Sequence, residues 1–171
     1  MKRCLLKLIS VLFVSLVIFT ACNKNTESDT STKDKVSSEQ TCTLTVNCIT
    51  ALGKAGEKDS LLPSNGIIYS EGEIKFNDGE SVFDVLKREM QSKKIHLEFS
   101  MTPIYNTAYI EGIANLYEFD CGELSGWMFK VNGEFPGVGC SSVSVHDGDV
   151  IEFVYSCDMG KDVGKEVLRD S

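Results

Sequence analysis

The first 40 residues offer little that a packed domain could use, and this restricts folding to the rest of the chain. The chain begins with a basic group, which consists of Lys2, Arg3 and Lys7. A mostly apolar run follows from Leu8 to Phe19. The order of basic, apolar and small residues is typical of a secretory signal peptide. The run is shorter than the roughly 20 residues of a spanning helix, which disfavours an uncleaved anchor. We therefore predict a signal peptide over residues 1–21.

The end of this leader carries a recognisable motif. Phe19-Thr20-Ala21-Cys22 resembles the bacterial lipobox, although leucine is usual where Phe19 stands. In the lipobox, the cysteine is acylated and becomes the new N-terminus. Two acyl chains suffice for stable membrane anchoring where one is marginal. The resemblance implies a lipid on Cys22 and an extracytoplasmic protein anchored to a bacterial cell membrane.

Residues 23–40 are almost all polar, and Val36 is their only large aliphatic side chain. Such a composition cannot bury enough surface to offset the entropy lost on ordering it. We predict a flexible, disordered tether over residues 22–40 and one folded domain over residues 41–171. Hydrophobic residues make up 42% of the chain, which is ordinary for a globular protein.

The charge of the chain argues against nucleic-acid partners. Removal of the leader takes away 3 of 17 basic residues and none of the 25 acidic ones, which changes the net charge from -8 to -11. No basic stripe interrupts this acidic surface. Because an acidic protein repels phosphate backbones, we expect no nucleic-acid binding.

Hydrophobic patterning predicts an α+β domain. Residues 41–50 alternate between apolar and polar side chains, as a half-buried strand does. One helix is expected to begin near Ser81, which can form a capping box with Asp84. Asn132-Gly133 is a strong hairpin signal, and a second hairpin is expected at residues 146–149. We predict one main helix with about six to eight strands, in a mixed or antiparallel sheet.

Five cysteines remain once Cys4 and Cys22 are set aside: Cys42, Cys48, Cys121, Cys140 and Cys157. In an oxidising compartment this number predicts two disulfides and one free thiol. The first and last strands of a sheet are often neighbours, so we expect Cys48 to pair with Cys157 and Cys121 with Cys140, although other connectivities stay open. The alternatives of a zinc site or a cysteine nucleophile lack support, because no CxxC occurs and neither histidine has a ligand at metal spacing.

Three stretches in the second half of the domain resemble a known family. In order and spacing they are similar to the bacterial domain that resembles the C-terminal domain of transcobalamin and intrinsic factor. The resemblance implies a β-grasp-like fold. In the animal proteins it implies cobalamin held between this domain and a helical barrel, and we expect no such barrel within these residues. The stretches are residues 106–116 (NTAYIEGIANL), 125–133 (SGWMFKVNG) and 145–155 (VHDGDVIEFVY).

The resemblance also suggests site residues. Trp127 matches the family's aromatic strand position that faces the corrinoid, and Gly126 adjoins it. Tyr105, Tyr109 and Phe135 are further candidates for ligand contact. For each aromatic residue the alternative is core packing, and a buried Trp127 would need a partner for its indole N–H. Asp147-Gly148-Asp149 is read as a turn, because it lacks the further acids of a calcium loop.

Two functions remain in view. The first is a surface lipoprotein that binds a small ligand, with cobalamin or another corrinoid as the candidate, but holds no cofactor or metal. The alternative is an adhesion module that binds a surface protein or a glycan through an exposed sheet edge, without a small-molecule pocket. We expect no enzymatic activity, because paired catalytic carboxylates, a phosphate-binding glycine loop and a serine elbow are missing as motifs.

Overall fold

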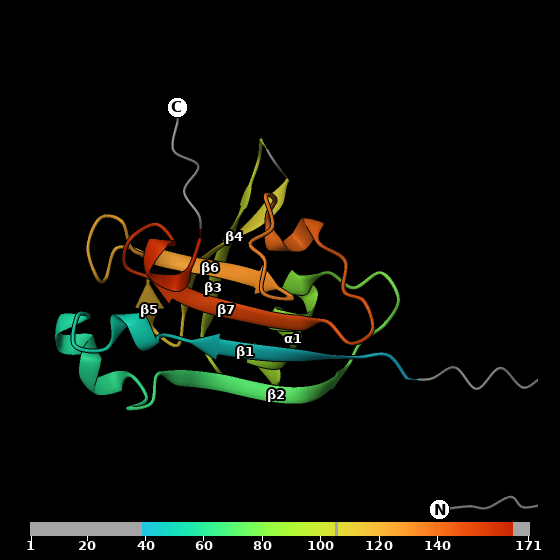
Figure 1. Cartoon of the computed structure of the whole chain (residues 1–171), viewed down its shortest axis with the longest axis horizontal. Helices are drawn as coiled ribbons and strands as arrows, with labels where there is room; N and C mark the ends of the chain where they lie inside the picture. The colour runs from blue at the N-terminus through green and yellow to red at the C-terminus, as the bar shows by residue number, and fades with distance from the viewer. Residues whose placement is uncertain (1–38, 105, 166–171) are drawn as a thin grey trace, which may run out of the picture. The chain divides into compact units, whose positions relative to one another are not determined.

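The computed structural model describes residues 39–104 and 106–165 (Figure 1). The expected signal peptide, Cys22, Tyr105 and all of the expected tether except residues 39 and 40 lie outside this part. The described residues contain seven strands, one α-helix and four short 3-10 helices. In chain order these are β1 (Thr41–Asn47), η1 (Ile49–Ala51), η2 (Gly56–Leu61), β2 (Ile67–Lys75), α1 (Val82–Ser92), β3 (Leu97–Thr102), β4 (Thr107–Ile113), β5 (Leu116–Tyr117), β6 (Gly126–Val131), η3 (Cys140–Ser142), β7 (Val150–Ser156) and η4 (Lys161–Val163).

The larger sheet has four strands in the order β2-β1-β7-β6, which Figure 1 shows stacked from bottom to top. The first and last strands are neighbours, as expected from the sequence, and β1 runs parallel to β7. The outer strands β2 and β6 pair antiparallel with their neighbours. The alternation in β1 is confirmed, since Cys42, Leu44 and Val46 are buried. Strand β6 forms one edge of this sheet.

The smaller sheet has the order β3-β4-β5 and is antiparallel throughout. The helix α1 contributes five buried residues to the common core, and Phe83 packs edge-to-face on Phe99 of β3 with ring centroids 4.7 Å apart. The predicted capping box is confirmed: Ser81 accepts from the Asp84 backbone N–H, and the Asp84 side chain accepts from the Ser81 backbone N–H. The α+β class is therefore confirmed, but the strands form two sheets where one was expected.

The expected hairpin turn at Asn132-Gly133 is present, and Val131 pairs with Glu134 across it. Residues 146–149 also form a turn, but the second expected hairpin is wrong, because Ser144 before the turn bridges Ser81 whereas β7 after it pairs with β1 and β6. Asn132 and Gly133 have φ of 52° and 84°, the left-handed values that a type I′ turn requires. In the second turn, Asp149 accepts from the backbone N–H of His146 at 2.8 Å and from the Asn132 side chain at 2.8 Å. Asp147 accepts from the backbone N–H of Thr41 at 2.9 Å. The two aspartates thus cap backbone groups and connect the turns.

Residues 39–104 and 106–165 contain no helix that is both long and apolar enough to cross a membrane.

Candidate functional site

Two adjoining hollows lie along the edge strand β6, with volumes of about 180 and 350 Å³. Four residues line both of them: Tyr109, Trp127, Met128 and Lys165. The larger volume lies within the range of about 300–1,000 Å³ that is usual for small-molecule sites. We call this surface the β6 groove and define it by the eight side chains Tyr109, Phe119, Leu124, Trp127, Met128, Phe135, Met159 and Lys165.

Trp127 is mainly a core residue, although part of it lines the groove. It is 8% exposed, and its indole N–H donates to the carbonyl oxygen of Leu116 at 2.8 Å. It also packs edge-to-face on Tyr155, with ring centroids 5.3 Å apart. The hydrogen bond satisfies the buried N–H, as expected for a packed tryptophan. The structure therefore favours the packing alternative, and a ligand would meet only a small part of the indole.

Alternation along β6 explains why Met128 faces differently from its neighbours. Successive side chains of a strand point to opposite faces, and Trp127 and Phe129 pack on Tyr155 and Phe153 of β7. Met128 instead meets the chain segment after β7. A Cβ added at Gly160 would lie 3.0 Å from the Met128 sulfur, so glycine permits this close approach. This segment carries Met159 and Lys165 to the groove.

Tyr109 contributes a neutral hydroxyl to the wall formed by β4. Its side chain is 43% exposed, and its O–H donates to a carboxylate oxygen of Glu118. Burial, together with this acceptor, raises the pKa of Tyr109 to about 12. The phenol therefore stays protonated at physiological pH and is held in a defined position.

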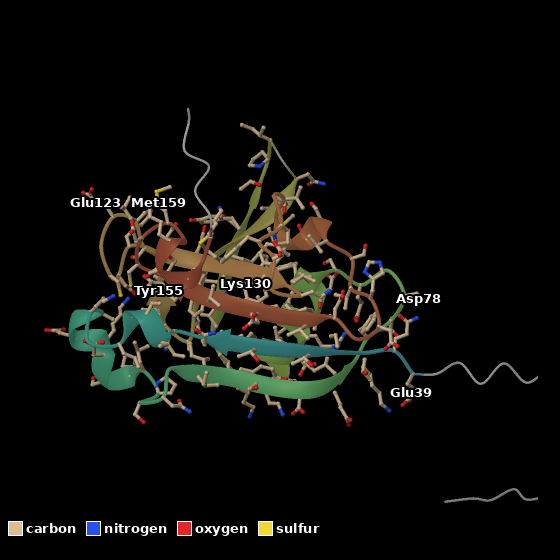
Figure 2. All side chains as sticks on the ribbon, viewed as in Figure 1. Glu39, Asp78, Glu123, Lys130, Tyr155 and Met159 are labelled. Carbon is tan, nitrogen blue, oxygen red and sulfur yellow. The ribbon has the colours of Figure 1, made fainter. Side chains whose placement is uncertain are left out.

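Exposed apolar side chains gather at one end of the groove. Phe119, Leu124 and Met159 are 61%, 50% and 63% exposed. The backbone N–H of Met159 donates to the Leu124 carbonyl at 3.0 Å, which joins the two loops that carry them. Figure 2 labels Met159 next to Glu123, which lines the same hollow. Contiguous exposed apolar surface of this kind marks interaction sites.

The conformation of Phe119 is unusual for an aromatic residue. Its φ is 68°, in the left-handed region that side chains other than glycine, asparagine and aspartate rarely adopt. The backbone N–H of Phe119 donates to the Ser125 carbonyl at 3.0 Å, and this bond holds the turn. Backbone strain of this type is concentrated at functional sites. An exposed, strained phenylalanine is therefore consistent with a binding role.

The structure brings four of the five predicted ligand-binding residues together. Tyr109, Trp127, Gly126 and Phe135 line the hollows, whereas Tyr105 lies outside the described residues. Phe135 is half-buried and lies below the Lys130 ammonium, 5.0 Å from the ring centroid. The sequence analysis missed five groove residues: Phe119, Leu124, Met128, Met159 and Lys165. For Phe119, Leu124 and Met159 the available signal was a large apolar residue within a polar loop.

The cysteines differ from the expected pairing. All five described cysteines carry free thiols. In the parallel register Asn47 is opposite Val154, so Cys48 lies level with Tyr155 instead of Cys157. Cys140 contacts the carbonyl of Ala108, at the start of β4. Cys121 follows β5, which pairs with the other end of β4.

In neither expected disulfide are the two cysteines direct neighbours in the fold. The seven residues of β4 extend over about 20 Å, and a disulfide requires Cα atoms within about 7 Å. The pairing of Cys121 with Cys140 therefore does not fit this fold. Among residues 39–104 and 106–165, no group of three or more histidine, cysteine or acidic side chains is placed to hold a metal ion.

Comparisons with known proteins agree with the fold. Residues 79–156 match the model of a family described as "Domain of unknown function (DUF4430)". These residues include all three stretches on which the sequence resemblance rests. No curated protein matches the chain.

Two solved structures are similar to this chain. Haptocorrin in complex with Cbi is similar with a TM-score of 0.50 and 18% identity; the match covers 70% of this chain and 25% of haptocorrin. A candidate metal-binding protein from Ruminococcus gnavus has a TM-score of 0.45 and 15% identity, over 69% of this chain and 97% of that protein. The chain thus spans about a quarter of the length of haptocorrin. At these identities the similarity concerns the fold alone.

Proposed function

We propose that this chain is an extracytoplasmic lipoprotein whose folded domain binds a small, flat, largely apolar ligand in the β6 groove, without catalysis. A corrinoid is the first candidate. The observation that carries the proposal is the gathering of exposed Phe119, Leu124 and Met159 beside Met128 in a hollow of about 350 Å³. Apolar walls with a few polar groups are the usual composition of ligand sites.

The size of the groove limits the affinity. Burying four such apolar side chains would contribute at most about 6–12 kcal/mol, since the value of about 1.5–3 kcal/mol each applies to complete burial from full exposure. Association costs at least about 4 kcal/mol in lost translational and rotational freedom. The remainder, at most about 8 kcal/mol, corresponds to a dissociation constant near 1 μM. We therefore expect micromolar or weaker binding to this chain alone.

The fold comparison motivates the choice of ligand. Haptocorrin, which shares the fold, was crystallised with Cbi, and this chain corresponds to about a quarter of it. A ligand in the β6 groove would be covered by this chain on one side. We propose that the other side is presented to a partner protein at the membrane surface, such as a transporter.

The membrane anchor is part of the proposal. The lipobox-like residues before Cys22 support acylation of its thiol, and the polar residues after it would act as a tether. Phase separation in a detergent, after expression in a bacterial host, tests this. The wild-type chain should enter the detergent phase, and Cys22→Ser should stay in the aqueous phase. Equal partitioning of the two would contradict acylation of Cys22.

Ligand binding is tested by titrating the full-length chain with cobinamide and cobalamin. Trp127 is the only tryptophan of the chain and borders both hollows, so its fluorescence reports on the groove. We expect saturable quenching, with a matching change in corrinoid absorbance. Met128→Ser should weaken binding about tenfold or more, because it removes roughly 1.5 kcal/mol or more of apolar contact.

Met101→Ser is the matched control. Met101 is 50% exposed on β3, away from the groove, so this variant should bind as the wild type does. An unsaturable response to both corrinoids would exclude them as ligands. Equal weakening by the two substitutions would place the binding site elsewhere.

One observation favours the alternative of an adhesion module. The loop at the tip of the β3–β4 hairpin carries Ile104, which is 88% exposed, and the hairpin projects at the top of Figure 1. A protruding apolar side chain is suited to contact with another macromolecule. Ile104→Asp should abolish attachment to a surface protein or glycan while leaving corrinoid quenching unchanged. The two functions can therefore be separated by one variant.

A further inference from the structure

Cys121 and Cys157 are brought together by the pairing of β6 with β7. Gly126 is opposite Ser156 in the antiparallel register, so the chain just before β6 faces the chain just after β7. Ser125 is buried and its hydroxyl accepts from the Cys121 backbone N–H at 3.1 Å. This bond folds the loop of Cys121 back towards Cys157.

A second set of contacts fixes the same arrangement. The Tyr155 hydroxyl donates to the Tyr117 carbonyl at 2.6 Å and also lies 3.0 Å from the Ser125 hydroxyl. The Cys157 thiol is directed inwards, since it donates to the Thr50 carbonyl at 3.2 Å. One residue beyond the Gly126–Ser156 pair, Ser125 lies opposite Cys157, and Ser125 also binds the backbone N–H of Cys121, so the two cysteines flank the same residue. Burial, together with the neighbouring Cys157 thiol, raises the pKa of the Cys121 thiol to about 11. Both cysteines are half-buried, so a small reagent can reach them.

We propose that Cys121 and Cys157 form a disulfide when the protein meets a disulfide oxidant. One protein thiolate attacks a sulfur of the oxidant, forms a mixed disulfide and releases the first thiolate of the oxidant. The second protein thiolate then attacks the protein sulfur of the mixed disulfide and releases the second. The protein thiols lose two protons and two electrons, and the oxidant is reduced to two thiols.

The bridge would join the two loops that form the apolar end of the β6 groove. Cys121 lies in the loop with Phe119 and Leu124, and Cys157 precedes Met159. The loops are already connected by the backbone bond from Met159 to Leu124. A covalent link between residues 121 and 157 restricts the unfolded chain and therefore stabilises the fold. It leaves Cys42, Cys48 and Cys140 as buried thiols.

Disulfide mapping of the full-length chain tests the proposal. The protein is incubated with oxidised glutathione at pH 8, free thiols are alkylated, and peptides are analysed by mass spectrometry. Cleavage after acidic residues is needed, because trypsin leaves Cys140 and Cys157 in one peptide. We expect a linked pair containing Cys121 and Cys157. The melting temperature should rise on the order of 10 °C on oxidation and fall again with dithiothreitol.

The variants distinguish this pair from others. Cys140→Ser should retain the linked peptide and the redox-dependent melting temperature, whereas Cys121→Ser and Cys157→Ser should lose both. The wild-type peptide map remains decisive if a variant does not fold. A bridge from either cysteine to Cys48 or Cys140, or separate glutathione adducts on Cys121 and Cys157, would overturn the proposal.

Discussion

The indole N–H of Trp127 donates to the carbonyl oxygen of Leu116 across 2.8 Å, and this bond joins β6 of the larger sheet to β5 of the smaller one. Trp127 is thus a structural tie between the two sheets. Trp127→Phe removes the donor and leaves the Leu116 carbonyl without its partner. We expect a loss of about 2–4 kcal/mol in the free energy of unfolding, from the hydrogen bond and the lost volume together.

Urea denaturation followed by circular dichroism measures this effect. Tyr109→Phe is a suitable control. It also removes one hydrogen-bond donor, a hydroxyl, but from a side chain that is 43% exposed. Its free energy of unfolding should change by less than about 1 kcal/mol. Equal losses in both variants would mean that Trp127 does not tie the sheets.

The sequence predicts the strand of Trp127 but not the partner of its indole. The mostly apolar run at residues 127–131 and the Asn132-Gly133 turn locate β6, because these signals are local. Leu116 lies on a different sheet, and strand order depends on long-range packing that no local pattern encodes. The division into two sheets was missed for the same reason.

The cysteines illustrate the same limit. Neighbouring positions for β1 and β7 were expected from the sequence, and the structure confirms them. The parallel register, which sets Cys48 level with Tyr155, depends on side-chain packing. A shift of two residues changes which thiols can meet. The groove positions of loop residues such as Phe119 and Leu124 could not be predicted. Irregular turns set the directions of their side chains, and such turns leave no repeating pattern in the sequence.

The left-handed conformation of Phe119 lowers the stability of the fold while it exposes the aromatic ring on the surface. Asparagine tolerates a φ of 68° better than phenylalanine does. Phe119→Asn should therefore leave the free energy of unfolding unchanged or raise it by up to about 1 kcal/mol. Binding in the β6 groove should weaken, because about 1.5–3 kcal/mol of apolar burial is lost.

Calorimetric melting and the corrinoid titration together check this prediction. Leu61→Asn is the control, since Leu61 is 66% exposed but belongs to η2, away from the groove. It should affect binding little. A clear loss of stability in Phe119→Asn would show that the phenyl ring supports the fold and that its conformation is not strained.

The helix cap predicts a pH dependence. Hydrogen bonds from the Ser81 hydroxyl and backbone lower the pKa of Asp84. The unfolded carboxylate has a pKa of about 3.9 and therefore binds a proton before the folded one as the pH falls. The stabilisation is present above that pH and is lost as the pH falls through the lower pKa of the folded state. Asp84→Asn should be less stable than the wild type at pH 6, and the difference should shrink below pH 3.

Urea midpoints at pH 6 and below pH 3 measure the effect. Glu123→Gln, at an exposed loop position, removes one acid without disturbing the cap, so its difference from the wild type should vary less with pH. Ser81→Ala removes the capping hydroxyl and should cost about 1 kcal/mol at pH 6. A constant difference between Asp84→Asn and the wild type at all pH values would contradict a role for the Asp84 charge.

The turn between β4 and β5 offers a test of backbone strain. Ala114 and Asn115 have φ of 51° and 64°, and the left-handed region costs an alanine about 1 kcal/mol relative to glycine. Ala114→Gly relieves this cost. Glycine also gives the unfolded chain more conformational freedom, which lowers the free energy of unfolding by about 0.4–1 kcal/mol. The two effects nearly cancel, so the free energy of unfolding should stay within about 0.5 kcal/mol.

Ala55→Gly is the comparison at a position without such strain, because Ala55 has a φ of -87°. Ala55 is also buried, so the substitution removes a packed methyl group and should lose about 1–2 kcal/mol in urea denaturation. An equal loss in Ala114→Gly would show that the turn stores no strain.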